Sequence, residues 1–365
     1  MSRSSFAVHL DAVRRRVDDD LARWLAPRVA SAHAVSAEVG AAAEAVSGLA
    51  IRGGKRMRAA LVAAGFAACD GAPSALDAAA PAMIAIELLQ VYLLIHDDWM
   101  DDDDVRRGGP AVHVALRERL GSKALGDAAA VLAGDLACGY AQEALLESRV
   151  GADRVLAAAR AFAKIQEDVV TGQLAEMSWT APLSAKGASA QRPAADGRAP
   201  TVETIHALKT ASYTVTGPLA IGACLAGASD ARVAQLTRYG RPLGIAFQLR
   251  DDLLGVFGDA SAMGKPVGND VRQGKRTALV AEMRGDARCE ALLSRTLGNA
   301  AATDADVAEI VAAMETSGAK ARVEARVAEL LAEARVALGA LGLADESPAK
   351  AWLEGAISAL GERAS

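Results

Sequence analysis

Apolar residues recur along most of the chain at intervals of three and four positions, the pattern of helices that bury one face. Turn-forming clusters at residues 70–73, 108–110 and 121–122 interrupt this pattern and separate one helix from the next. Hydrophobic residues make up 52% of the chain and aromatic residues only 4%, and alanine, leucine and valine dominate the apolar share. Because this composition favours helix over sheet, we predict an all-α protein with little or no strand.

One stretch lacks the helical period. Residues 183–200 are rich in alanine, serine, glycine and proline, so they are predicted to form a mobile loop. Such a segment also resembles a linker between domains. However, the candidate phosphate-binding and metal-binding residues described below lie on both sides of it and need one another. We therefore predict a single domain spanning residues 1–365.

The charge and the most apolar segment exclude several classes of function. A net charge of -5 offers no basic surface for nucleic acid. Residues 78–95 are the most apolar segment, but Pro81, Glu87 and Gln90 interrupt it, so we predict a buried helix and no membrane span. The four cysteines are far apart and the N-terminus lacks the apolar core of a signal peptide. Both features predict a cytoplasmic protein with reduced thiols.

An acidic cluster follows this apolar segment, with six aspartates among the eight residues 97–104. On a helix, Asp97 and Asp101 lie one turn apart on one face, as do Asp98 and Asp102, so each pair can offer oxygens to a common cation. Few, hard oxygen ligands suit Mg²⁺, which takes its other ligands from water and substrate phosphates. A solvated acidic helix end is the alternative interpretation.

A second acidic cluster, residues 248–259, also ends an apolar helical stretch. Basic residues accompany both clusters: Arg106 and Arg107 follow the first, a glycine-rich loop with lysines follows the second, and residues 53–58 place three cations at a helix start. Free backbone N–H groups at a helix start also favour anions. Two carboxylate clusters and three basic segments in one helical chain are explained most simply by two diphosphates and several Mg²⁺ ions.

At these residues the chain resembles the trans-isoprenyl diphosphate synthases, the polyprenyl synthetase family that includes farnesyl and geranylgeranyl diphosphate synthases. Residues 53–58 match the family's GGKRxR motif, residues 97–101 its first DDxxD motif, and residues 248–252 the start of its second aspartate-rich motif. Gly172-Gln173 and Lys209-Thr210 resemble its GQ and KT pairs. The resemblance implies a single-domain helical bundle with a central active-site cavity and, by family habit, a homodimer.

The resemblance also implies a role for individual residues in joining an allylic diphosphate to isopentenyl diphosphate. It assigns three Mg²⁺ ions to Asp97, Asp98, Asp101 and Asp251. It assigns the allylic diphosphate to Arg106, Lys209 and Lys265, and isopentenyl diphosphate to Lys55, Arg58, Gln90 and Arg107. Thr210 and Gln248 would face the developing carbocation. Further substrate-binding residues would be Gln173, Asp252 and Lys275.

Two positions depart from the family pattern: Gly255 replaces the third aspartate of the second motif, and Glu176 stands where an aspartate is usual. Product length is expected to depend on Tyr92 and Leu93, which precede Asp97 by about one helical turn. A single aromatic residue there resembles geranylgeranyl more than farnesyl synthases. The alternatives are a terpene cyclase, which needs no isopentenyl diphosphate site, and a non-catalytic partner subunit of a prenyl synthase.

Overall fold

The computed structural model describes residues 5–72, 76–180, 200–258, 269–299 and 301–361. Helices account for most of them, and the strands in this part of the chain are those of one short hairpin. The all-α prediction is therefore confirmed. The predicted loop at 183–200, except for its last residue, and Lys265 lie outside the described residues.

The contacts within the chain group it into two compact units, each built from several segments. Unit 1 comprises Met1–Ala163, Gly217–Leu236 and Leu343–Gly355, and unit 2 comprises Lys164–Thr216, Thr237–Gly342 and Ala356–Ser365. Three of the five boundaries between the units fall within helices, namely α7 (Ala152–Thr180), α10 (Asp230–Phe257) and α17 (Pro348–Gly361). The single domain expected from the sequence stays a prediction.

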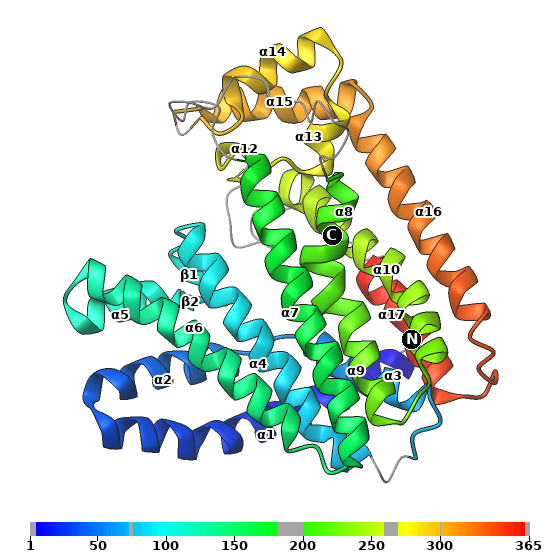
Figure 1. The fold of residues 1–365 in the computed structure, drawn as a ribbon. Coiled ribbons are helices and arrows are strands. Elements are labelled where there is room, and N and C mark those ends of the chain that lie inside the picture. Colours follow the sequence, from blue (N-terminus) through cyan, green and yellow to red (C-terminus); the bar gives the residue numbers. More distant parts are fainter. Residues whose placement is uncertain (1–4, 73–75, 181–199, 259–268, 300, 362–365) are drawn as a thin grey trace. The chain divides into compact units, whose positions relative to one another are not determined.

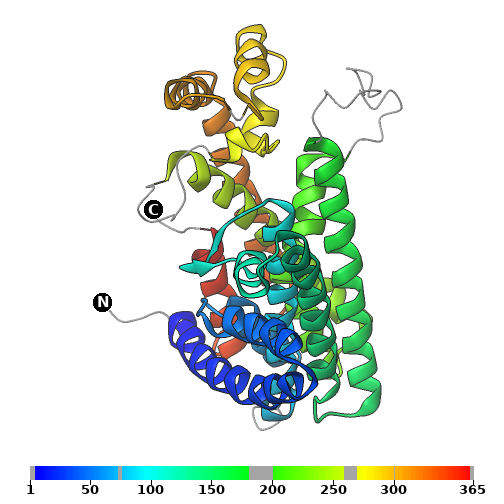
Figure 2. The same cartoon turned by 90° about the vertical axis from the view of Figure 1, so that its left-hand side faces the viewer.

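Unit 1 is built around the apolar helix α4. Its elements are α1 (Ser5–Val35), α2 (Ala37–Ile51), α3 (Met57–Ala67), α4 (Leu76–Met100), β1 (Val105–Arg106), β2 (Gly109–Pro110), α5 (Val112–Leu120), α6 (Lys123–Leu146) and α9 (Gly217–Leu225). Helices α4 and α6 lie side by side (Figure 1), and α4 also packs on α3. Helices α1 and α2 form a hairpin (Figure 2), in which the Ser36 side chain accepts a hydrogen bond from the Val39 N–H and so begins α2.

Glycines allow two helices of unit 1 to approach closely. A Cβ atom on Gly65 of α3 would lie 2.3 Å from the Leu219 carbonyl oxygen of α9, and one on Gly222 would lie 2.0 Å from the Val62 carbonyl oxygen. Helix α4 is long and apolar enough to cross a membrane, but 67% of its most apolar window is buried inside the protein. Such burial is typical of a core helix, as the sequence predicted.

Unit 2 contains several short helices besides parts of the long ones. Its further elements are α8 (Val202–His206), η2 (Ala207–Thr216), α12 (Asn269–Arg272), α13 (Ala278–Glu282), α14 (Ala287–Thr296), α15 (Asp304–Thr316) and α16 (Ala319–Gly339). The segment η2 is π-helical, a rare geometry that occurs mostly near functional sites. It continues directly from α8 and packs closely on α10, where a Cβ on Gly244 would lie 2.4 Å from Ala211 Cβ. These three elements carry most of the predicted site residues of unit 2.

Candidate active site

One face of α4 carries the first acidic cluster. Gln90, Leu93, Asp97 and Asp101 follow one another at intervals of three and four residues, so they line the same face of the helix. All four are half-buried. The Asp101 N–H still donates to the Asp97 carbonyl oxygen at 2.9 Å, so the helical register that joins the two carboxylates is kept to the end of the helix.

The helix ends immediately after this pair. Asp102 has a left-handed backbone with φ of 51°, and the Asp103 N–H donates to the Asp98 carbonyl oxygen at 2.9 Å. This is the bonding pattern of a Schellman C-terminus, in which glycine usually occupies the left-handed position. Asp102 is therefore turned away from the helical face, and its carboxylate lies 3.3 Å from Arg117. The shared helical face that the sequence predicted for Asp98 and Asp102 is therefore not formed.

Asp98 points into the protein, and its side chain is fully buried. The Arg106 guanidinium donates through Nε to Asp98 Oδ1 at 2.7 Å and also through Nη2, which reaches Asp103 Oδ2 at 3.2 Å. Burial raises the pKa of Asp98, and the hydrogen bond from Arg106 acts in the opposite direction. Asp98 thus fixes an arginine in place; its predicted role as a metal ligand stays a prediction.

A tight hairpin carries Arg106 and Arg107. Arg107 and Gly108, its two central residues, have φ values of 52° and 72°, the signs that a type I′ turn requires. Arg52 holds the hairpin by donating to the carbonyl oxygens of Arg106 (3.3 Å) and Pro110 (2.8 Å). A left-handed arginine is strained, and such strain is common at functional sites.

The segment 53–58 is fixed by its central arginine. Arg56, whose side chain has no exposed surface, donates to Asp18 Oδ1 (2.7 Å), Glu87 Oε2 (3.1 Å) and the Ala50 carbonyl oxygen (2.7 Å). Glu87 is itself buried and also accepts from the N–H of Ala59. One arginine therefore ties the start of α3 to α1, α2 and α4.

Unlike Arg56, its two basic neighbours in this segment are accessible to solvent. Lys55 is exposed and Arg58 is half-buried. Arg107 lies close enough to Arg56 and Arg58 for their charges to act on it: burial lowers the pKa of Arg107, and these neighbouring guanidinium groups lower it further, although Glu87 opposes them. Unit 1 thus gathers cations from the 53–58 segment and from the hairpin, an arrangement that favours an anion.

In unit 2, α7 and η2 are in close contact beside Gly172. A Cβ atom on residue 172 would lie 2.5 Å from the backbone nitrogen of Lys209, so only glycine allows this approach. One turn further along α7, Glu176 forms an ion pair with Lys209. Gln173, the other half of the GQ pair, is half-buried on the same helix. The structure therefore brings the GQ and KT pairs together.

A chain of hydrogen bonds links η2 to α10. Thr210 Oγ1 donates to Gln248 Oε1 at 2.8 Å, and Gln248 Nε2 donates to Asp252 Oδ1 at 2.9 Å. His206, the last residue of α8, places its Nε2 atom 3.5 Å from Asp252 Oδ2. Asp252 and His206 are both buried, whereas Asp251 is half-buried. The second acidic cluster thus also contains one inward and one outward carboxylate.

The outward carboxylates fit magnesium in kind and number. Among the described residues, no group of three or more His, Cys, Asp or Glu side chains can hold a metal ion by itself. Mg²⁺ needs no such group, because it commonly binds one or two carboxylates and completes its octahedron with water and phosphate oxygens. Asp97 with Asp101 in unit 1 and Asp251 in unit 2 supply donors of this type.

Sequence analysis missed three features of the site. It counted Arg56 only as one of three cations at a helix start, it did not foresee the Arg106 partner of Asp98, and it passed over His206. The last had a weak signal, since this histidine precedes the Lys209-Thr210 pair by less than one helical turn. The structure also places Lys275 half-buried in unit 2.

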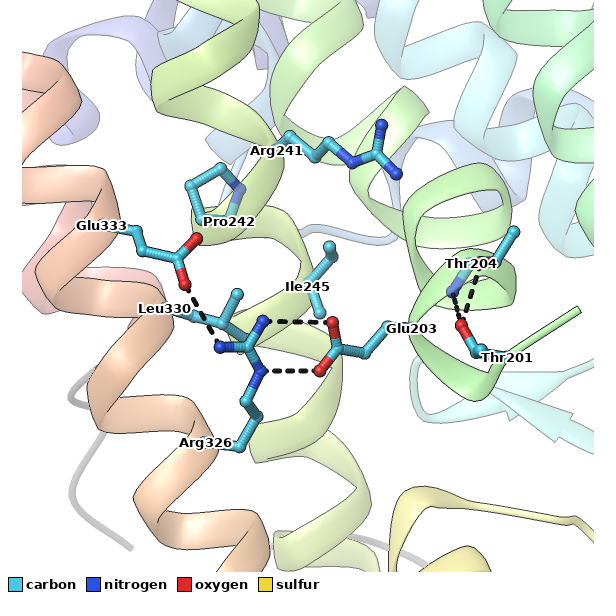
Figure 3. Close-up of a pocket in the computed structure, with 9 residues that line it drawn as sticks. All are labelled: Thr201, Glu203, Thr204, Arg241, Pro242, Ile245, Arg326, Leu330 and Glu333. Atoms are coloured by element: carbon cyan, nitrogen blue, oxygen red, sulfur yellow. Dashed lines mark hydrogen bonds and ion pairs between the residues drawn. The ribbon is translucent and has the colours of Figure 1, made fainter.

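A separate pocket of about 210 Å³ lies in unit 2 between α8, α10 and α16 (Figure 3). Its charged groups largely satisfy one another: Arg326 donates to both carboxylate oxygens of Glu203, at 2.7 and 3.2 Å, and to Glu333 at 3.1 Å. Hydrogen bonding to Arg326 lowers the pKa of Glu203. None of the predicted site residues lines this pocket.

Known proteins resemble the chain in sequence and in fold. It is 36% identical over 231 residues to the short chain isoprenyl diphosphate synthase of Methanothermobacter thermautotrophicus, a match that covers 62% of each chain. It is 33% identical over 284 residues to the (2E,6E)-farnesyl diphosphate synthase of Mycobacterium bovis, covering 75% of this chain and 70% of that one. The chain thus spans less than two thirds of the length of the Methanothermobacter protein.

A solved structure extends the likeness to nearly the whole chain. The geranylgeranyl pyrophosphate synthase of Corynebacterium glutamicum, crystallised with isoprenyl diphosphate and magnesium, superposes with a TM-score of 0.85 at 30% identity, covering 97% of this chain and 99% of that one. The family model for polyprenyl synthetase matches residues 41–314, about three quarters of the sequence. The chain therefore belongs to the polyprenyl synthetase family.

Proposed function

We propose that the protein is a magnesium-dependent short-chain trans-prenyltransferase. It condenses an allylic diphosphate head-to-tail with isopentenyl diphosphate and yields geranylgeranyl or farnesyl diphosphate together with diphosphate. The observation that carries this proposal lies within unit 1, where half-buried carboxylates on α4 and a cluster of cations from two other segments belong to one compact body. Relatives named as geranylgeranyl and farnesyl diphosphate synthases support it.

Isopentenyl diphosphate is assigned to Lys55, Arg58, Arg107 and Gln90. The lowered pKa of Arg107 reflects burial and neighbouring positive charge, both of which a bound diphosphate would offset. Arginine is suited to this task because its planar guanidinium binds two phosphate oxygens at once. The buried Arg56 would not touch the substrate, since its own N–H groups bind Asp18, Glu87 and Ala50.

The allylic diphosphate is assigned to Arg106, Lys209 and Lys265, with Gln173, Asp252 and Lys275 as further substrate-binding residues. Asp97 and Asp101 would hold two Mg²⁺ ions and Asp251 a third. Bound magnesium would neutralise the charge that develops on the leaving diphosphate. Magnesium is present with isoprenyl diphosphate in the Corynebacterium structure, and calcium with isoprenyl diphosphate in a Caulobacter crescentus polyprenyl synthase.

The protein's own groups then guide the carbocation. When the carbon–oxygen bond of the primer ionises, the oxygen atoms of Thr210 and Gln248 would stabilise the allylic cation. The double bond of isopentenyl diphosphate attacks this cation, a carbon–carbon bond forms, and a proton is lost. The released diphosphate can accept that proton, so no histidine is needed as a base. His96 has a structural partner instead, the Val131 carbonyl oxygen at 3.0 Å.

One experiment separates this function from its alternatives. The purified protein is incubated with Mg²⁺, labelled isopentenyl diphosphate and each short allylic primer, and the products are dephosphorylated and chromatographed. A prenyl synthase incorporates the label. A terpene cyclase consumes the primer without it, and a non-catalytic partner subunit does neither. The cations of the 53–58 segment disfavour a cyclase, and the retained aspartates disfavour an inactive subunit.

Product length is proposed to depend on Tyr92 and Leu93. Leu93 shares the helical face of Asp97, four residues later. Tyr92 is half-buried and turned toward His96, with the ring centroids 4.8 Å apart, and burial raises the pKa of its hydroxyl. A bulky side chain about one turn before Asp97 would limit the growing chain, which favours geranylgeranyl diphosphate as the product.

We also propose a homodimer in the cytoplasm. Helix α6 exposes three leucines, Leu125, Leu132 and Leu146, and the exposed fraction of Leu132 is 66%. Because they are seven and fourteen residues apart, they lie on one face of the helix. An apolar face of this kind is suited to burial against a second copy. Multi-angle light scattering should give a dimer for the wild type and a monomer for Leu132→Glu. The four cysteines are free thiols, as in a reducing compartment.

A further inference from the structure

His206 lies beside Thr210 and Gln248, the two residues of unit 2 that are proposed to face the carbocation. It belongs to none of the family motifs described above. It is the last residue of α8 and leads directly into the π-helical segment that carries Thr210. Its side chain is buried, and its Nε2 atom is 3.5 Å from Asp252 Oδ2. Asp252 is buried as well, so the two groups face each other away from bulk water.

The other oxygen of Asp252 determines how Gln248 is oriented. A glutamine amide can rotate by half a turn with little change of shape, which exchanges its oxygen and its NH₂ group. A carboxylate accepts hydrogen bonds and does not donate them, so Asp252 Oδ1 requires the NH₂ group on its side, at 2.9 Å. The amide oxygen then lies on the side of Thr210, which donates to it at 2.8 Å.

This orientation matters for the proposed reaction. An amide oxygen carries partial negative charge and stabilises a nearby carbocation, whereas an NH₂ group would repel it. Anything that keeps Asp252 in place therefore keeps the stabilising atom of Gln248 available. The imidazole of His206 contacts the oxygen of Asp252 that Gln248 does not use.

We propose that His206 is a positioning residue that acts through Asp252 to hold the Gln248 amide in its cation-stabilising orientation. The inference rests on the proposed function of Gln248. His206 itself does not touch substrate. Its Nε2 atom lies 3.5 Å from Asp252, Asp252 accepts a hydrogen bond from Gln248, and Gln248 accepts one from Thr210, so these four side chains of α8, η2 and α10 act as one unit.

The test compares two substitutions of similar size. His206→Gln keeps an N–H group near the position of Nε2, whereas His206→Met fills the space without a donor. We expect His206→Met to lower kcat roughly tenfold to a hundredfold, the effect of removing the polar contact to a buried carboxylate oxygen, with both KM values nearly unchanged. His206→Gln should recover most of the rate. An unchanged kcat in the methionine variant, or equal losses in both variants, would overturn the proposal.

His9→Met is the matched control. His9 is also buried and hydrogen-bonded, to the Ala60 carbonyl oxygen at 3.1 Å, and its ring stacks on Trp352 at 3.7 Å. This substitution should lower the melting temperature without changing kcat. A comparable loss of kcat here would mean that removing any buried histidine slows the enzyme, which contradicts a specific role for His206.

A spectroscopic measurement without metal tests the inference independently of enzymatic activity. Nitrogen-15 spectra of protein labelled at histidine, assigned with His206→Gln, should show His206 protonated at Nε2, and Asp252→Asn should shift that signal. A His206 ring without a proton at Nε2, or one unaffected by Asp252→Asn, would refute the contact. If the wild type makes no product from isopentenyl diphosphate, the proposed function fails, whereas these spectra still decide the His206 contact.

Discussion

The two acidic clusters use the same pair of adjacent aspartates in different settings. In unit 1 the pair Asp97-Asp98 stands at the end of α4, where the chain turns into a hairpin, and the buried member binds a cation, Arg106. In unit 2 the pair Asp251-Asp252 lies inside α10, which continues to Phe257, and the buried member meets Gln248 and His206. The outward members, Asp97 and Asp251, are both half-buried.

Two adjacent aspartates on a helix therefore do not act as one chelating pair. Neighbouring residues point about 100° apart around the helix, so one carboxylate can face a ligand while the next faces the interior. The inward carboxylate then needs a partner from the protein, because an unpaired buried charge is costly. The partner differs between the clusters, but the division of labour is the same.

The largest expected effect belongs to the outward members. Asp97→Ala and Asp251→Ala should each lower turnover on the order of 1,000-fold or more, because the leaving diphosphate loses its metal-mediated stabilisation. Stability should be nearly unchanged, since neighbouring carboxylates repel one another without metal. Steady-state rates measured beside thermal melts check both statements. A variant with near-normal turnover in magnesium would remove its residue from the metal site.

The segment 53–58 also contains an inward residue, Arg56, and an outward one, Arg58. Arg58→Ala should weaken the use of isopentenyl diphosphate roughly tenfold to a hundredfold and leave the KM of the allylic primer unchanged, because one charge-assisted phosphate contact is lost. Initial rates with each substrate varied in turn measure the two KM values. If the primer's KM rose instead, the two diphosphate pockets would be assigned the wrong way round.

Arg56→Met is the matched inward control for that prediction. It leaves the buried carboxylate of Glu87 without its ion-pair partner, which typically costs about 3 to 5 kcal/mol of stability. Its main effect should therefore appear in the thermal melt. Equal melting temperatures for Arg56→Met and Arg58→Ala would contradict the distinction between the two arginines.

A smaller effect on stability should separate Asp98 from Asp97. Asp98→Ala removes the acceptor of the Arg106 guanidinium, and we expect a loss of about 1 to 3 kcal/mol, since Arg106 remains partly exposed to water. Asp97→Ala should lose almost nothing. Chemical denaturation of both variants without magnesium measures the difference. Equal stabilities would show that the buried position of Asp98 has no energetic consequence.

The smallest change in rate, but a change in product, is expected at Tyr92 on α4. Tyr92→Ala should lengthen the product by one or more isoprene units with turnover largely retained, because a bulky limit is removed. If Tyr92 is only a packing residue beside His96, the variant should be less stable and its product unchanged. Chromatography of the dephosphorylated products decides, and an unchanged length from a folded, active variant would exclude Tyr92 from the site.

The sequence was sufficient for the helical fold and for the residues that share a helix face. The four-residue spacing of Asp97 and Asp101 predicted their common face because a helix repeats every 3.6 residues. The same rule failed for Asp102, since it assumes that the helix continues, and the left-handed residue at this position ends it. Glycine is the usual signal of such an end, and here an aspartate takes its place.

Contacts between distant segments were the other limit. The carboxylate partners of Arg56 come from positions 31 and 38 residues away, and no periodic pattern predicts such pairs. The π-helical segment has no simple sequence signature either, so the route from His206 through Asp252 to Gln248 required coordinates. Burial decided which charged residues serve the fold and which remain available to substrate.

The most direct test of the account is whether the purified protein joins labelled isopentenyl diphosphate to an allylic primer. With Mg²⁺ present, we expect a labelled prenyl diphosphate, with geranylgeranyl diphosphate favoured over farnesyl diphosphate as the product. This product should be lost after chelation of the metal and in Asp97→Ala and Asp251→Ala. Consumption of the primer without incorporation of label, or full incorporation by either aspartate variant, would contradict the account.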